Sequence, residues 1–265
     1  MKRLGVMLLV AALLSVATPA AAEPGSLDPV VKALKTQFAK KSGVRFTVKR
    51  QGGPPYSFDM KGSGTYRFRA SGVYAADTVQ ITREPSGGTG RSRGISIGHE
   101  FYSQSYVRSK TGEYTHKSPS QLGKWRHGRH LAGVIWGDDL INGINPGFLE
   151  LAATTGVTTT DGGTFEGVKT TLHSGTVTVP VLGERQAGMF FDLAEDDGSY
   201  RGPIIWKLWV GPDNLPRRFH AIMRHHAKWT DDVEVETMTM NIIYRGWGTR
   251  ARITAPPERL LSTDW

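Results

Sequence analysis

Histidines occur in two small groups that could bind a metal ion. His127 and His130 lie three positions apart, and His220 precedes the adjacent pair His225 and His226. Zinc sites use such side chains, but arginines stand beside the first group and no carboxylate motif accompanies either one. Adjacent residues of a strand also point to opposite faces. The pattern therefore favours ordinary surface or strand-end histidines, and we expect no metal site.

Paired carboxylates and a nucleophile are the other groups that catalysis would need. Asp138–Asp139 and Glu195–Asp197 could supply the acid and base of a glycosidase, but adjacent carboxylates are typical of solvated turns. The chain has no cysteine and no Gly-x-Ser-x-Gly elbow. Gly62–Gly64, which brackets a serine, is expected in a hairpin turn. The sequence therefore predicts neither an enzyme nor a cofactor.

Two amphipathic segments predict helices. The first spans Pro29 to about Lys41, after an N-cap at Asp28. The second begins at Asn145, also an N-cap, and stops at Gly156. Both present an apolar stripe on one side, so each is expected to pack on another layer of structure.

Most of the remaining chain alternates apolar and polar residues, which predicts strands with one buried face. Turn residues separate the strands at hairpin intervals, and the helices are isolated insertions, so an antiparallel sheet is favoured. A short helical turn is expected over residues 136–144. We expect a single domain over residues 23–265. The clearest strands are Val44–Val48, Tyr66–Phe68, Val79–Ile81, Ile95–Ile97, Trp206–Val210, Phe219–Met223 and Met238–Tyr244.

One face of such a sheet must be covered by the helices. If the sheet curls around them, the apolar faces meet, and incomplete packing leaves a hydrophobic cavity. The same residues could instead form a plain core, and a shift of one residue in register would exchange the two faces. The cavity candidates are Leu34, Phe38, Phe148 and Leu149 from the helices, and Phe46, Phe68, Ile97, Trp206, Leu208, Met223 and Met240 from the sheet.

Residues 1–22 have the layout of a secretory signal peptide. Lys2 and Arg3 precede an apolar run over residues 4–17, and small residues ending at Ala22 form a cleavage site. No segment is long and apolar enough to cross a bilayer. The mature protein is therefore expected to be secreted or held in the cell envelope, without a lipid-anchor cysteine and stabilised by its own core.

The mature chain would carry a net charge of +7, because loss of Lys2 and Arg3 leaves 31 basic residues against 24 acidic ones. This charge favours anionic surfaces of a cell envelope as partners. The basic residues are spread along the chain without a compact run, so we expect no nucleic-acid partner.

Several short motifs occur in an order that resembles a known family. They are Ser42–Phe46, Pro146–Leu149, Glu166–Thr171, Leu215–Arg218, and Trp247–Gly248 followed by Ala255–Pro257. Their order is similar to that of the LolA-like lipoproteins of actinobacteria, the LppX, LprA, LprF and LprG group. The resemblance implies an α+β fold in which a large curved antiparallel sheet, a half-barrel, has two or three helices covering its concave face. It also implies lipid-like cargo.

The sequence thus predicts an exported, non-enzymatic carrier that binds a lipid or acyl chain between the sheet and the helices. Two alternatives stay open. One is an envelope sensor or interaction module of the same fold with a filled cavity. The other is a cell-wall protein that binds polyanions through its positive charge.

Overall fold

The computed structural model describes residues 23–53, 57–83, 87–108, 123–129, 141–178, 202–227 and 234–262. Several sequence predictions lie outside these ranges and stay predictions. They are the signal peptide, the carboxylate pairs Asp138–Asp139 and Glu195–Asp197, His130, and most of the helical turn expected over residues 136–144.

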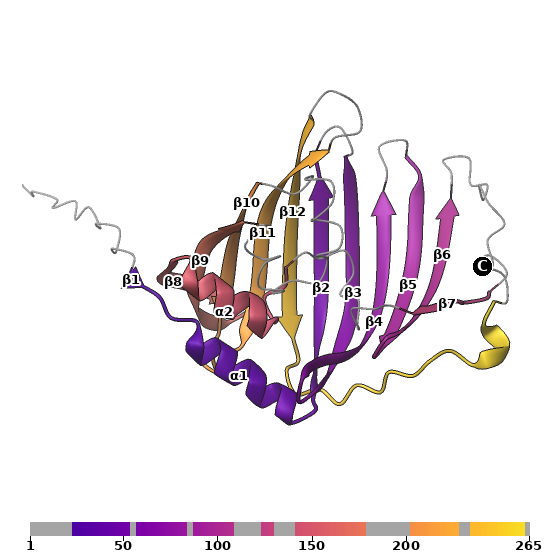
Figure 1. Cartoon of the computed structure of the whole chain (residues 1–265), viewed down its shortest axis with the longest axis horizontal. Helices are drawn as coiled ribbons and strands as arrows, with labels where there is room; N and C mark the ends of the chain where they lie inside the picture. The colour runs from indigo at the N-terminus through magenta and orange to yellow at the C-terminus, as the bar shows by residue number, and fades with distance from the viewer. Residues whose placement is uncertain are drawn as a thin grey trace, which may run out of the picture.

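Twelve strands in the described ranges form one sheet in which every neighbouring pair is antiparallel. The spatial order is β1-β8-β9-β10-β11-β12-β2-β3-β4-β5-β6-β7, so the last long strand lies beside the first one (Figure 1). The strands are β1 (Glu23–Pro24), β2 (Gly43–Gly52), β3 (Phe58–Arg69), β4 (Gly72–Arg83), β5 (Thr89–Ile97), β6 (Glu100–Arg108), β7 (Arg126–Arg129), β8 (Val157–Phe165), β9 (Val168–Thr178), β10 (Pro203–Val210), β11 (Pro216–Ala227) and β12 (Glu234–Arg245).

Alternation of side chains explains why these segments form strands. In β2, Val44, Phe46 and Val48 are buried on one face, while Arg45 and Lys49 are exposed on the other. All seven segments predicted as strands lie within strands. The expected hairpin turn at Gly62–Gly64 is wrong, because these residues lie inside β3, where the glycines let large side chains of β2 cross over them.

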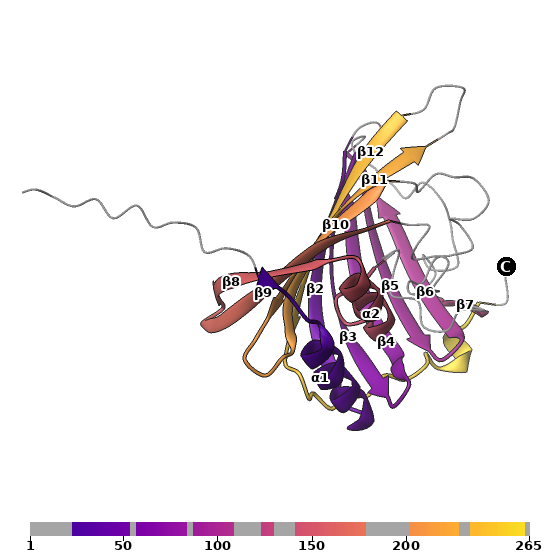
Figure 2. The same ribbon diagram turned by 60° about the vertical axis from the view of Figure 1, so that its left-hand side comes forward.

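Two helices cover part of the concave face of this curved sheet (Figures 1 and 2). They are α1 (Asp28–Ala39) and α2 (Pro146–Thr154), and a short 3-10 helix, η2 (Glu258–Leu260), lies near the C-terminus. Lys35 of α1 and Glu150 of α2 form an ion pair with a nitrogen–oxygen distance of 2.7 Å. The structure confirms the predicted fold class, a large curved antiparallel sheet with helices on its concave face.

The caps of the two helices differ from each other. The side-chain oxygen of Asn145 accepts hydrogen bonds from the backbone N–H groups of Gly147 and Phe148, which confirms Asn145 as the N-cap of α2. Asp28 is not the N-cap of α1. The capping position is Leu27, which supplies no side-chain hydrogen bond, and Asp28 is the first residue of the helix.

The main core lies between the helices and the concave face. The apolar stripe of α1 (Val30, Val31, Leu34 and Phe38) and that of α2 (Phe148, Leu149, Leu151 and Ala152) meet buried residues of the central strands. Within the described residues, neither helix is long and apolar enough to cross a membrane.

A second, smaller core lies on the convex face. Ala75, Ile95 and Tyr102 point away from the main core and are covered by Trp125 and by Ile253 of the segment that follows β12. This C-terminal segment, residues 246–262, leaves β12 through Gly246 and Gly248, whose φ angles of 63° and 86° suit glycine. The segment therefore starts beside a central strand, because β12 lies between β11 and β2.

Candidate ligand-binding face and basic cavities

Ten of the eleven cavity candidates belong to the main core, and each has at most 6% of its surface exposed. Ile97 is the exception, because it packs against the second core on the convex face. The pattern Ile95-Ser96-Ile97 correctly predicts that the side chains alternate. It does not tell which face is the inner one, and Ser96 is the residue that points to the concave side.

The helix-covered candidates pack against one another. The ring centroids of Phe38 and Phe68 lie 4.7 Å apart, and those of Phe148 and Trp206 lie 5.9 Å apart in an edge-to-face arrangement. Such contacts are those of a close-packed protein interior. The part of the concave face beneath α1 and α2 is therefore a packed core.

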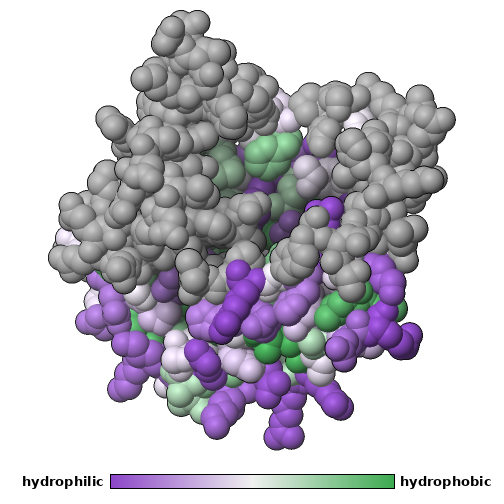
Figure 3. Space-filling view, turned by 45° about the vertical axis from the view of Figure 1, so that its right-hand side comes forward, coloured by the Kyte–Doolittle hydropathy of each residue, from purple (hydrophilic) through white to green (hydrophobic). Residues whose placement is uncertain are grey.

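The concave face changes character beyond the helices, over β4 to β6. Apart from Phe101, half-buried side chains that are small or polar replace the large apolar ones. Figure 3 shows a hollow whose visible floor carries hydrophobic and hydrophilic residues. We call this stretch the concave trough. Its residues are Thr78, Gln80, Ser92, Gly94 and Ser103.

A buried arginine lies where the packed core meets the trough. Arg50 has 3% of its surface exposed and points to the concave side of β2. It pairs with Met240 of β12 on one side and with Met60 of β3 on the other. Met238 and Met223 pair with each other one step farther along the same face. We call these five residues the methionine patch.

The methionine patch combines an adaptable apolar surface with a fixed positive charge. Methionine is unbranched and polarizable, so it adapts to irregular shapes. A buried guanidinium is costly unless it is paired, and Arg50 already interacts with another group of the protein. Its five N–H donors let it bind more than one acceptor. The alternation of residues in the sequence indicated Met223 and Met240 but not Arg50, because only the strand register places Arg50 among the methionines.

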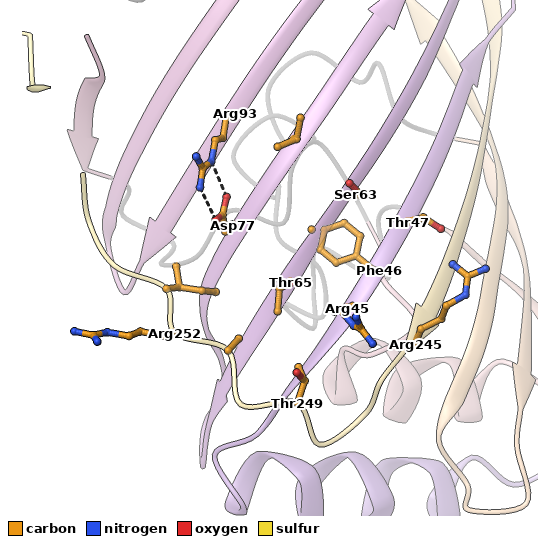
Figure 4. Close-up of a pocket in the computed structure, with 14 residues that line it drawn as sticks. Arg45, Phe46, Thr47, Ser63, Thr65, Asp77, Arg93, Arg245, Thr249 and Arg252 are labelled. Atoms are coloured by element: carbon orange, nitrogen blue, oxygen red, sulfur yellow. Dashed lines mark hydrogen bonds and ion pairs between the residues drawn. The ribbon is translucent and has the colours of Figure 1, made fainter. Parts of the chain in front are cut away.

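Two cavities on the convex side of the described residues are bordered by the C-terminal segment. The first has a volume of about 720 Å³ and lies between the sheet and residues 249–253 (Figure 4). Of the cavity candidates, Phe46 is among its lining residues. Its charged residues are Arg45, Asp77, Arg93, Arg245 and Arg252.

Two of these arginines are paired. Arg93 donates hydrogen bonds to both carboxylate oxygens of Asp77, at 3.1 and 2.8 Å, and these bonds raise the pKa of its guanidinium further above its usual value. Arg245 is paired with Glu166, and its hydrogen bonds lower the pKa of that carboxyl. Both pairs are on the surface, where an ion pair contributes about 0–1 kcal/mol to stability.

The second cavity is strongly basic. It has a volume of about 770 Å³ and opens beside the end of α1. No carboxylate is among its lining residues, and within the described part of the chain its five cations make no side-chain hydrogen bond or ion pair. We call this cavity the basic groove. Its cations are Lys40, Lys41, Arg67, Arg250 and Arg252.

The histidines that suggested a metal site are placed separately. The Nε2 atom of His127 lies 2.6 Å from a carboxylate oxygen of Glu100, a partner that the sequence did not indicate. His220 lies on β11, several strands away. Among the described residues, no group of three or more histidine, aspartate or glutamate side chains is placed to bind a metal ion.

The sequence matches no family model and no curated protein. Three solved structures are weakly similar to this chain. A β-barrel-like DUF1849 protein from Brucella abortus has a TM-score of 0.28 at 8% identity, over 77% of this chain and 98% of that one. A porin-like protein from Bacteroides uniformis has a TM-score of 0.22 at 8% identity, over 76% of this chain and 97% of that one. A LolA superfamily protein from Nitrosomonas europaea has a TM-score of 0.21 at 7% identity, over 91% of this chain and 99% of that one.

Proposed function

We propose that this protein is an exported, non-enzymatic carrier that binds an acyl chain with an anionic head group on the concave face of its sheet. The observation that carries the proposal is the methionine patch, in which a buried Arg50 is flanked on both neighbouring strands by methionine. The proposal agrees with the sequence resemblance to the LolA-like actinobacterial lipoproteins. Export would follow from the signal peptide predicted for residues 1–22.

The two parts of such a ligand match the two parts of the site. Burying an acyl chain stabilises a complex by about 0.8 kcal/mol for each methylene group. A carboxylate or phosphate would bind the guanidinium of Arg50 through charge-assisted hydrogen bonds, which suit the planar fork of arginine. The neighbouring trough, with its small and polar side chains, would hold whatever part of the ligand extends past β3.

The proposal predicts that Arg50 distinguishes acids from neutral amphiphiles. We expect the delipidated mature protein to bind dodecanoate more tightly than dodecanol, as measured by isothermal titration calorimetry. Substituting Arg50→Gln should weaken dodecanoate binding by tenfold or more, because a hydrogen bond to a charged group contributes about 1.5–3 kcal/mol. Dodecanol binding should change much less.

Lys49→Gln is the matched control for this experiment. Lys49 precedes Arg50 in β2 but is exposed on the convex face, so this variant loses the same charge and should bind both ligands as the wild type does. The thermal unfolding midpoint of each variant tests whether the fold is retained. If folded Arg50→Gln binds dodecanoate as tightly as the wild type, Arg50 does not hold the head group.

The packed core beneath α1 and α2 favours a second candidate, a sensor or interaction module of the same fold. Mass spectrometry of organic extracts separates the two candidates. A lipid present at about one per protein, in material purified from a secreting host, supports the carrier. No lipid, together with no uptake of fluorescent acyl probes by the delipidated protein, supports the interaction module.

A further inference from the structure

We propose that the basic groove binds a linear polyanion with repeating phosphate groups. The groove lies at the start of β2, beside Ser42 and the end of α1. Arg50 lies seven residues farther along the same strand, about 23 Å away at the usual rise of a strand. The groove is therefore a second site, separate from the proposed acyl-binding face.

The charges of the groove are unbalanced within the described structure. Lys40 and Lys41 come from the end of α1, Arg67 from β3, and Arg250 and Arg252 from the C-terminal segment. Like charges gathered in one cavity repel one another, and a bound anion relieves that repulsion. The three separate chain segments bring together cations that are scattered in the sequence, which is why no basic run was visible there.

The shape and lining of the groove favour an extended chain over a membrane surface. Membrane-docking surfaces combine basic side chains with exposed apolar or aromatic ones that enter the bilayer interface. In this groove Ala251 is the apolar lining residue, and the other lining residues are polar, basic or glycine. Ala251 and Arg252 also line the first cavity, so the positive surface continues toward Arg45. A polyanionic chain can follow such a path, contacting successive cations with successive phosphates.

Long-chain inorganic polyphosphate is the probe that tests this site. Its affinity for the mature protein should fall linearly on a double-logarithmic plot as the salt concentration rises, because bound counterions are released. In the triple variant Arg67→Gln/Arg250→Gln/Arg252→Gln we expect affinity at low salt to fall at least tenfold. The slope of log affinity against log salt concentration should also become less steep by roughly two. Each phosphate contact adds somewhat less than one to the size of this slope, and the variant loses three cations.

The matched control is Lys61→Gln/Arg83→Gln/Arg91→Gln. These three residues are exposed on β3, β4 and β5, do not line the basic groove, and carry the same total charge. The control should keep nearly all of the polyphosphate affinity. Equal losses in both triple variants would show that net charge alone drives binding and would overturn the site.

Two further outcomes would overturn the proposal. One is an absence of polyphosphate binding by the wild type at low salt. The other is stronger binding to phosphatidylglycerol vesicles than to polyphosphate, which would assign the groove to a membrane surface. Dodecanoate binding by the groove variant should stay at the wild-type level. Measuring both ligands therefore distinguishes a wrong assignment of the basic groove from a wrong assignment of the acyl-binding face.

Discussion

The contact between Gly64 and Phe46 shows how a single residue type is fixed by a distant one. The Phe46 ring crosses Gly64 on the neighbouring strand and stacks on Tyr66, with ring centroids 4.3 Å apart. A Cβ atom on Gly64 would lie 2.7 Å from the Phe46 ring and 2.5 Å from the carbonyl oxygen of Asp77. In the sequence, Gly62-Ser63-Gly64 looks like a turn, because the residue that requires glycine is 18 positions away.

Substituting Gly64→Val should destabilise the protein by about 1–3 kcal/mol, the usual cost of overpacking a close contact. Urea unfolding followed by tryptophan fluorescence measures the change. Gly90→Val is the control, because a Cβ atom on Gly90 of β5 meets nothing within 4 Å. Similar losses in both variants would mean that replacing a strand glycine, and not the Phe46 contact, causes the effect.

Two histidines give the stability a predictable dependence on pH. Burial lowers the pKa of His173, and burial followed by the charges of Arg218 and Lys207 lowers the pKa of His220. Below about pH 6.5 the unfolded chain therefore binds more protons than the folded one. The free energy of unfolding should fall as the pH decreases through 6.5 toward the folded-state pKa values.

The double variant His173→Gln/His220→Gln should show a flatter dependence than the wild type over this window, in urea titrations at a series of pH values between 7.5 and 5. A dependence as steep as that of the wild type would mean that other groups control it.

At the scale of elements, the two helix starts have different energetics. Asn145 caps α2 through its side chain, whereas Asp28 acts on α1 through its charge in the first turn. Asn145→Ala should cost about 1 kcal/mol of stability, and Asp28→Ala should cost less in the same thermal or urea measurement. A larger loss in Asp28→Ala would contradict the assignment of the caps.

The positions of the helices and strands were largely predictable from the sequence. Which face of a strand packs against which core was not. Alternation fixed the strands, and proline with a capping residue fixed the start of α2, because these signals are local. The inward face of β5 was mispredicted at Ile97, since the apolar residues of that strand are buried on the convex face, in the second core. The second core arises from the C-terminal segment, whose path across the sheet has no local signature.

At the scale of the whole molecule, one sheet carries the two proposed sites, which differ in their chemistry. The concave face holds the methionine patch, and the convex side holds the basic groove near the opposite end of β2. Residues for both sites were visible in the sequence as scattered methionines and cations. Their assembly depends on pairing between distant strands and on the three segments that meet at the groove, which composition does not encode.

The pairing of β12 with β2 also determines when this protein finishes folding. Arg245 pairs with Arg45, 200 positions earlier in the chain. During synthesis from the N-terminus, β2 is made early, but its partner β12 is made almost last. One edge of β2 therefore stays unpaired until nearly the whole chain has been made. Non-local pairing of this kind slows folding, and an unpaired edge invites association with other chains. Until β12 has been made, this edge of β2 is therefore open to pairing with other chains.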